Sequence, residues 1–224
     1  MKLSNLFICI GLLSLIFASC RKQDYLYKDF LKDGEINYVG KVDTAFVHSG
    51  NHRIKLSFNL KDPNINRVKV IWDLGGDSVI VPIQKGIGLE TFDVLLDNLE
   101  ERLYSFVIYT LDKNDNKSVA YRIQGQSYGE EYISTLLNRA ISTISYAGTN
   151  ATINWYEGNE QLLETEIIYT TLDQVEQTLI LPSNQNSIVL TNIDRSKGLK
   201  YKTIYKPNEL AIDQFHTEYS TRNL

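Results

Sequence analysis

Cysteine, methionine and proline are scarce in this chain of 224 residues, and there is no large excess of charge of either sign. The two cysteines are Cys9 and Cys20, there is one Met, and only four residues are Pro. Lys and Arg number 23 against 27 Asp and Glu, a net charge of −4. Such a balance supplies no basic field for the phosphates of a nucleic acid, so no nucleic-acid partner is expected.

Long hydrophobic runs are also lacking. The longest apolar stretch covers residues 6–17, which is 12 residues. A transmembrane helix needs about 20 apolar residues to cross the hydrocarbon core. Lys2 before the run and the small residues Ala18 and Ser19 after it are typical of a signal peptide, predicted here as residues 1–19.

The end of this segment, Phe17-Ala18-Ser19-Cys20, resembles the bacterial lipobox. The resemblance implies diacylglycerol on the Cys20 sulfur and a membrane partner through that lipid anchor. The expected location is the cell envelope, on the outer membrane, with the surface or periplasmic face left open. A plain signal peptide followed by a coincidental Cys is the alternative. Removal of residues 1–19 would leave Cys20 as the only cysteine, so no disulfide is expected.

Tyrosine is abundant, with 14 residues, and 43% of the chain is hydrophobic. Such material can form a core, and aromatic and β-branched side chains favour strands. Alternating or apolar segments predict strands at residues 41–47, 53–58, 67–72, 78–83, 91–96, 103–109 and 118–123. The order repeats at residues 151–155, 164–169, 177–181, 187–190, 199–205 and 211–215.

About seven strands in about 90 residues are typical of a β-sandwich. The predicted fold class is therefore all-β, with two tandem fibronectin type III-like or immunoglobulin-like sandwiches. The expected domains are residues 20–35 for the lipidated Cys and tether, 36–127 for the first sandwich and 128–224 for the second. Tyr104 and Tyr201, each near the start of a sixth strand, are the predicted tyrosine corners, and residues 133–137 suggest a short helix at the junction.

Several segments together resemble a domain-of-unknown-function family of Bacteroidetes lipoproteins, over roughly residues 25–220. They are residues 34–43, 53–58, 70–72, 109–118, 128–132, 136–139 and 205–213. The resemblance implies no established activity, but membership of loci for glycan capture. Some members carry an added carbohydrate-binding domain, and this sequence shows none before Leu224.

No catalytic constellation emerges from the sequence, and no cofactor or metal site is expected. His48 and His52 are four residues apart, but Ser49-Gly50-Asn51 between them does not predict a helix that would align them. Residues 112–117 resemble the start of a calcium loop, yet Lys117 and Ile123 replace the required Gly and Glu, so a hairpin turn fits better. Thr44 and Ser78 follow Asp and precede an apolar residue, which resembles the Bacteroidetes O-glycosylation signal.

Three functions follow in order of preference. The first is a membrane-anchored, non-catalytic binding or adhesion module, an accessory to capture of a glycan or an envelope protein, with end loops such as 73–77 and 112–117 as contact points. The second is a structural spacer or assembly subunit of an envelope complex. The third, an enzyme, requires a cleft with converging acids that the sequence does not predict.

Overall fold

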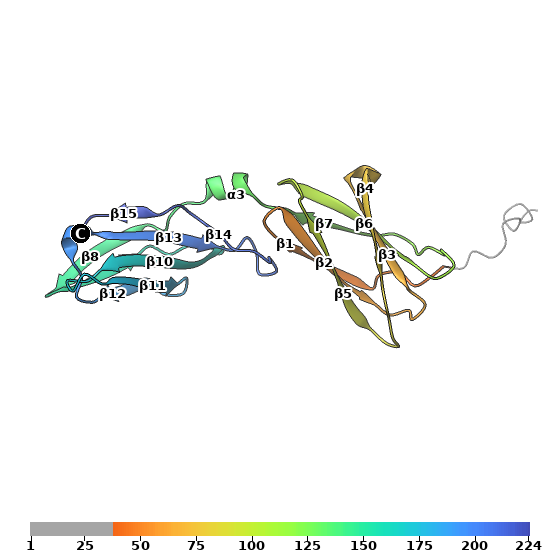
Figure 1. Cartoon of the computed structure of the whole chain (residues 1–224), viewed down its shortest axis with the longest axis horizontal. Helices are drawn as coiled ribbons and strands as arrows, with labels where there is room; N and C mark the ends of the chain where they lie inside the picture. Colours follow the sequence, from red (N-terminus) through yellow and green to blue (C-terminus); the bar gives the residue numbers. More distant parts are fainter. Residues whose placement is uncertain (1–37) are drawn as a thin grey trace, which may run out of the picture. The chain divides into compact units, whose positions relative to one another are not determined.

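The structure, a computed structural model, describes residues 38–224 (Figure 1). The predicted signal peptide, Cys20 and the tether to residue 35 lie outside these residues. Val39–Leu224 clusters as one unit, and within it the strands form two successive sandwiches. None of the helices within the described residues is long and apolar enough to span a membrane.

The first sandwich pairs a three-stranded sheet with a four-stranded one, in the orders β1-β2-β5 and β4-β3-β6-β7. All neighbouring strands are antiparallel. Its strands are β1 (Thr44–Ser49), β2 (Arg53–Leu60), β3 (Arg67–Trp72), β4 (Asp77–Pro82), β5 (Glu90–Asp97), β6 (Leu103–Leu111) and β7 (Tyr121–Gln126). The short 3-10 turn η1 (Asp73–Gly75) joins β3 to β4.

Alternation of side chains explains where the first core lies. In β2, Ile54, Leu56 and Phe58 point to one face and are fully buried, and Val68 and Val70 of β3 meet them from the other sheet. Because side chains in a strand alternate with a period of two, the intervening residues stay on the outer faces. A core this well enclosed supplies the main driving force for the fold.

The second sandwich repeats the arrangement, in the sheet orders β12-β9-β8 and β11-β10-β13-β14, with β15 also pairing with β13. Its core contains Ile153, Trp155 and Ile167. Its strands are β8 (Ile141–Ala147), β9 (Asn150–Trp155), β10 (Leu162–Thr170), β11 (Glu176–Pro182), β12 (Ser187–Leu190), β13 (Leu199–Tyr205), β14 (Phe215–His216) and β15 (Ser220–Arg222). The 3-10 turn η2 (Arg195–Lys197) precedes β13.

Both sandwiches place their first, second and fifth strands in one sheet and the third, fourth, sixth and last in the other. This is the strand order of a fibronectin type III domain, and the repeated topology confirms the predicted all-β fold class. The short helix α3 (Glu130–Thr135) lies between β7 and β8, near the predicted junction. The helix contains Ile133 but ends before Leu136 and Leu137. Leu136 caps its C-terminus with an extended backbone.

The strand predictions differ from the structure in four places. Strand β8 was not predicted, because most of its side chains are exposed and its sequence shows no regular apolar alternation. The three-residue strand β15 was not predicted either. The last strand of the first sandwich lies three residues later than predicted, at Tyr121–Gln126. The prediction of a strand at 211–215 was wrong. Only Phe215 of that segment pairs in β14, because the backbone N–H of Ile212 donates to the carbonyl of Ser49 in the first sandwich instead of to a ladder.

Candidate functional site at the junction of the two sandwiches

Three segments that are far apart in the sequence meet where the two sandwiches join. They are the turn between β1 and β2, the segment around Tyr128 after β7, and the loop between β13 and β14. The Tyr128 N–H donates to the Gly50 carbonyl over 3.0 Å, and the His52 N–H donates to the Tyr128 carbonyl over 2.8 Å. The Ile212 N–H reaches the Ser49 carbonyl over 2.8 Å. Backbone groups from both sandwiches therefore satisfy one another, which a loose linker would not require.

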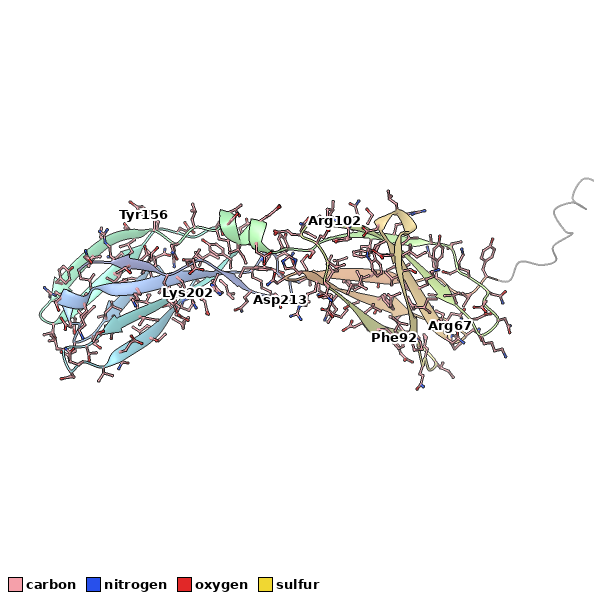
Figure 2. All side chains as sticks on the ribbon, turned by 45° about the horizontal axis from the view of Figure 1, so that its top comes forward. Arg67, Phe92, Arg102, Tyr156, Lys202 and Asp213 are labelled. Atoms are coloured by element: carbon pink, nitrogen blue, oxygen red, sulfur yellow. The ribbon has the colours of Figure 1, made fainter. Side chains whose placement is uncertain are left out.

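An ion pair completes these backbone contacts. Asp213, on the loop before β14 (Figure 2), accepts from Arg53 at both oxygens, 2.8 Å from Nε and 2.5 Å from Nη2. Its Oδ2 also accepts from the Asn51 N–H at 2.8 Å. The Arg53 hydrogen bond is the main cause that lowers the pKa of Asp213 below its usual value. Two parallel bonds from a planar guanidinium fix orientation as well as distance.

Gly50 allows the sandwiches to approach this closely. A Cβ on Gly50 would lie 2.5 Å from Asp213 Oδ2 and 2.9 Å from the Ile212 side chain. Contacts that short do not occur, so a larger residue would displace these side chains, together with that of Arg53, whose Cγ would lie 2.9 Å away. Glycine at this position therefore leaves room for the Arg53–Asp213 pair.

The entry to α3 is held by the first sandwich. The carboxylate of Glu101, between β5 and β6, accepts from the N–H groups of Glu131 and Tyr132, both at 2.7 Å. These are free donors at the start of the helix, and a carboxylate satisfies them in place of the capping side chain that Gly129 lacks. The connecting segment is therefore tied down at its first turn.

Aromatic rings fill the space beside the helix. Tyr132 lies 4.7 Å from Tyr128 and 5.1 Å from Phe215 of β14, ring centroid to centroid. Its hydroxyl donates to Gln161 Oε1 at 3.0 Å. Burial raises the pKa of Tyr132 to about 12. The cluster joins the linker to the second sandwich, so α3 contacts both sides of the junction.

His52 contacts Glu130 at the start of helix α3. Its backbone is left-handed, with φ 52°, and its ring nitrogens lie 3.0 Å from the Leu99 carbonyl and 2.6 Å from Glu130 Oε2. Both partners only accept, so both nitrogens donate when the ring is protonated. The hydrogen bond to Glu130, followed by that to Leu99, raises the pKa of His52 above 6.5.

We expect an NMR titration to place the pKa of His52 above 6.5 and to show it falling toward 6.5 in Glu130→Gln. Because the folded-state pKa is raised, the pair's contribution to stability is complete below pH 6.5 and is lost as the pH rises through the raised value. Glu131→Gln is the matched control, since its side chain is next in sequence but makes no hydrogen bond to His52. An unchanged His52 titration in Glu130→Gln would contradict this pairing.

A Ser, a His and an Asp also meet on the outer face of the β1-β2-β5 sheet, a cluster that the sequence did not predict. The register places Ser57 opposite Asp93. Ser57 Oγ lies 2.9 Å from His48 Nε2, and the Ser57 hydrogen bond is the main cause that lowers the pKa of Asp93. His48 Nδ1 contacts the Leu210 carbonyl, not a carboxylate, at 2.9 Å. A catalytic triad needs the imidazole between the carboxylate and the hydroxyl, so this order does not build one.

A groove opens on the outer face of the first sandwich, with a volume of about 480 Å³. Its lining includes Arg102, Tyr109 and Arg122, with the turn η1 along one side. Asp73 and Leu74 of that turn are left-handed, with φ 51° and 55°, and Leu74 is fully exposed at 109%. A left-handed non-glycine residue costs about 1–2 kcal/mol. Arg102 (Figure 2) forms a 2.5 Å ion pair with Asp73, which holds this strained turn in place.

The predicted modification sites lie apart from the junction. Cys20 is outside the described residues. Thr44 is exposed at the start of β1, and its hydroxyl accepts from Asn59 at 2.8 Å. Ser78 is exposed in β4, next to η1. Both O-glycosylation sites remain predictions.

The two tyrosines proposed as corners differ in environment. Tyr104 is buried, Arg102 lies 4.0 Å above its ring, and its hydroxyl interacts with the backbone of Glu100 four residues earlier. Burial, which outweighs the opposite effect of Arg102, raises the pKa of Tyr104. Tyr201 is half-buried and packs edge-on against Trp155, 5.0 Å between centroids. Their roles as corners stay predictions.

Within residues 38–224, no group of three or more His, Cys, Asp or Glu side chains is arranged to hold a metal ion. His48 and His52, which are four residues apart, have separate partners at the junction.

The segments on which the family resemblance rests converge at the junction, since Arg53, Tyr128, Tyr132 and Asp213 all belong to them. The sequence offered the residues of the junction but not their association.

The chain belongs to the DUF4998 family, described as a domain of unknown function, whose model matches residues 20–215. This confirms the predicted membership of a domain-of-unknown-function family. The comparison with curated proteins gives no match.

Solved structures with similar folds contain fibronectin type III domains. A two-domain segment of chicken tenascin is 13% identical, with 83% of this chain and 99% of that one covered and a TM-score of 0.32. The FN1–FN3 domains of chicken CNTN1 are 11% identical, with 81% and 64% covered and a TM-score of 0.42. The central fibronectin-III array of RIM-binding protein is 13% identical, with 85% and 72% covered and a TM-score of 0.32.

Proposed function

We propose that this chain is a non-catalytic lipoprotein of the bacterial outer membrane, which presents a binding surface on two sandwiches held as one unit. The observation that carries the proposal is the junction, where Asp213 binds both Arg53 and the Asn51 backbone. A fixed junction keeps the surfaces of the two sandwiches in one arrangement, which lowers the entropic cost of binding a partner. The proposed setting is the envelope of a Bacteroidetes bacterium.

Lipid on Cys20 is the proposed anchor, supported by the sequence Phe17-Ala18-Ser19-Cys20 after an apolar segment. Several acyl chains, each contributing about 0.8 kcal/mol per buried CH₂, would give stable attachment. Mass spectrometry of the mature N-terminus should find a diacylated Cys20. An unmodified Cys20, or cleavage elsewhere, would refute the anchor. Protease treatment of intact cells would then separate a surface position from a periplasmic one.

The groove beside η1 is the proposed contact surface, because it combines an exposed apolar side chain with cationic groups. Leu74 stands at its rim, and Arg122 lines it and forms no salt bridge within residues 38–224. The proposed ligands are a glycan or an envelope protein. Loop and edge residues on a rigid scaffold commonly bind ligands.

Glycan arrays and pull-downs from the native envelope should give ligands that wild type binds and that Leu74→Asp and Arg122→Glu bind at least tenfold more weakly, a loss of about 1.4 kcal/mol. Leu172→Asp, half exposed on the second sandwich, is the control that should bind like wild type. Binding that is equal in all four proteins would refute the groove as the contact surface.

A structural spacer is the second candidate, and the same junction favours it. A spacer needs fixed sandwiches and neighbouring envelope proteins, but no ligand in the groove. Partners recovered equally with wild type and both groove variants, without any glycan, would favour the spacer. Catalysis receives no support from the Ser57 cluster, because its imidazole has no orienting carboxylate on the far nitrogen.

A further inference from the structure

We propose that the loop of residues 83–89 in the first sandwich contacts the surface of the membrane in which Cys20 is anchored. This inference rests on the proposed lipid anchor. It adds a second attachment, which would orient the sandwiches relative to the bilayer. The loop connects β4 to β5 and is distinct from the groove beside η1.

The loop displays apolar side chains to solvent. Ile87 is 97% exposed and Leu89 is 61% exposed. Ile87 stands between Gly86 and Gly88, and Gly88 is left-handed with φ 105° and has nothing near the position of a Cβ. A large aliphatic residue flanked by two glycines at a loop tip buries nothing within its own fold. Together with Leu89 it forms a small apolar tip that is open to a partner outside the sandwich.

The loop is preorganised by its own polar groups. Lys85 Nζ donates to the carbonyl of Gly86 at 3.0 Å and also to that of Gly88. The Gly86 N–H donates to Glu90 Oε1 at 2.9 Å. These bonds close the loop across its base, so Ile87 is held at the tip instead of folding back. A preformed tip loses little conformational freedom on contact.

The loop lies at the end of the sandwich where the described chain begins. The Gly40 N–H donates to Asp62 Oδ2 at 2.7 Å, and Lys85 is near enough to the same carboxylate to contribute to its lowered pKa. Burial alone would raise the pKa of Asp62, but hydrogen bonds from the backbone of Asn64 and Gly40 outweigh it. The loop and the start of the sandwich therefore share one end, opposite to η1, because the β3–β4 ladder runs from Arg67 and Pro82 to Trp72 and Asp77.

A lipid surface fits this end better than a protein does. Residues 21–37 separate Cys20 from the described chain, and 17 residues reach at most roughly 60 Å. The anchor therefore keeps this end near the bilayer without setting its orientation. Two aliphatic side chains are far too few for a protein interface of about 800 Å² per partner. Exposed Lys41 and Lys61 flank the same end and suit anionic lipid headgroups.

The test uses the full lipidated chain, whose Cys20 sulfur is blocked by lipid, so that one introduced cysteine takes an environment-sensitive dye. Ile87→Cys carries the dye at the loop, and Leu74→Cys carries it at the fully exposed tip of η1 as the matched control. Each protein is reconstituted into vesicles of phosphatidylethanolamine and phosphatidylglycerol. Flotation, the emission wavelength and quenching by spin-labelled lipids are measured.

The proposal predicts that both proteins float, that the dye at residue 87 shifts to shorter wavelength, and that spin-labelled lipids quench it but not the dye at residue 74. Ile87→Asp should leave flotation unchanged, because the lipid anchor supplies the attachment. Floating protein with equally water-exposed dyes at both positions would overturn the loop contact alone. Failure of every variant to float would overturn the anchor, and this inference with it.

Discussion

Replacing Arg139 with Met is expected to lower the free energy of unfolding of the second sandwich by about 2–4 kcal/mol. Arg139 is only 4% exposed. Its guanidinium donates to the Tyr156 carbonyl at 2.8 Å, the Gln185 carbonyl at 2.9 Å and Asn186 Oδ1 at 2.5 Å. Met fills similar space but donates nothing, so three oxygens in a buried site lose their partner. Urea unfolding, followed by the fluorescence of Trp155 in a Trp72→Phe background, measures the change.

The Arg139 guanidinium donates only to neutral oxygens, and it forms no salt bridge within residues 38–224. Burial accordingly lowers its pKa from the usual value. Arg139→Lys should recover only part of the stability, since one ammonium does not match a planar fork that reaches three acceptors. Arg222→Met, exposed on β15, is the control and should change stability by less than about 0.5 kcal/mol. Equal stabilities of Arg139→Met and Arg222→Met would contradict this account.

Replacing Asp213 with Ala is expected to loosen the junction, with hydrogen exchange at the Asn51 and Ile212 amides at least about tenfold faster. A tenfold change corresponds to about 1.4 kcal/mol, near the contribution of one hydrogen bond to a charged group. The substitution removes both bonds to Arg53 and the acceptor of the Asn51 N–H. Amide exchange followed by NMR or mass spectrometry measures it, while the strands of both sandwiches should exchange as in wild type.

Asp97→Ala is the matched control for the junction. Asp97 lies opposite Arg53 in the β2–β5 ladder and acts on it only through charge, without a hydrogen bond. Its loss should leave exchange at Asn51 and Ile212 near the wild-type rate. The pKa of Asp213 is lowered in the folded chain, so its contribution is complete above the usual value of 3.8 and is lost as the pH falls through the lowered one. Equal exchange in Asp213→Ala and wild type would contradict the proposed role.

Alternating side chains made most of the fold predictable. Residues 53–58 and 67–72 were predicted as strands because every second side chain is apolar. The structure buries most of these apolar residues and half-buries Trp72. The internal repeat predicted that both halves would have the same topology, which the two sets of sheets confirm. Local periodicity is sufficient to predict such strands, since the alternation of apolar residues within a strand determines which of its faces is buried.

The junction could not be predicted in the same way. Its bonds join Asn51 and Arg53 to Asp213, some 160 positions apart, and they are polar contacts without periodicity. The same contacts explain why the predicted strand at 211–215 does not form, because the Ile212 N–H donates to the Ser49 carbonyl. Strand β8 was missed because an exposed edge strand needs few apolar residues. Only the fold brings these segments together, so the sequence revealed the residues and not their pairing.

The junction is expected to hold the two sandwiches in one fixed arrangement. Pulsed electron paramagnetic resonance measures this, with spin labels on Ser78→Cys in the first sandwich and Ser187→Cys in the second, in a Cys20→Ser background. Both positions are exposed strand residues, and the remaining cysteine, Cys9, lies in the predicted signal peptide. We expect a single narrow distance distribution between the labels that becomes broad in Asp213→Ala and stays narrow in Asp97→Ala. A broad distribution in wild type, or a narrow one in Asp213→Ala, would contradict this expectation.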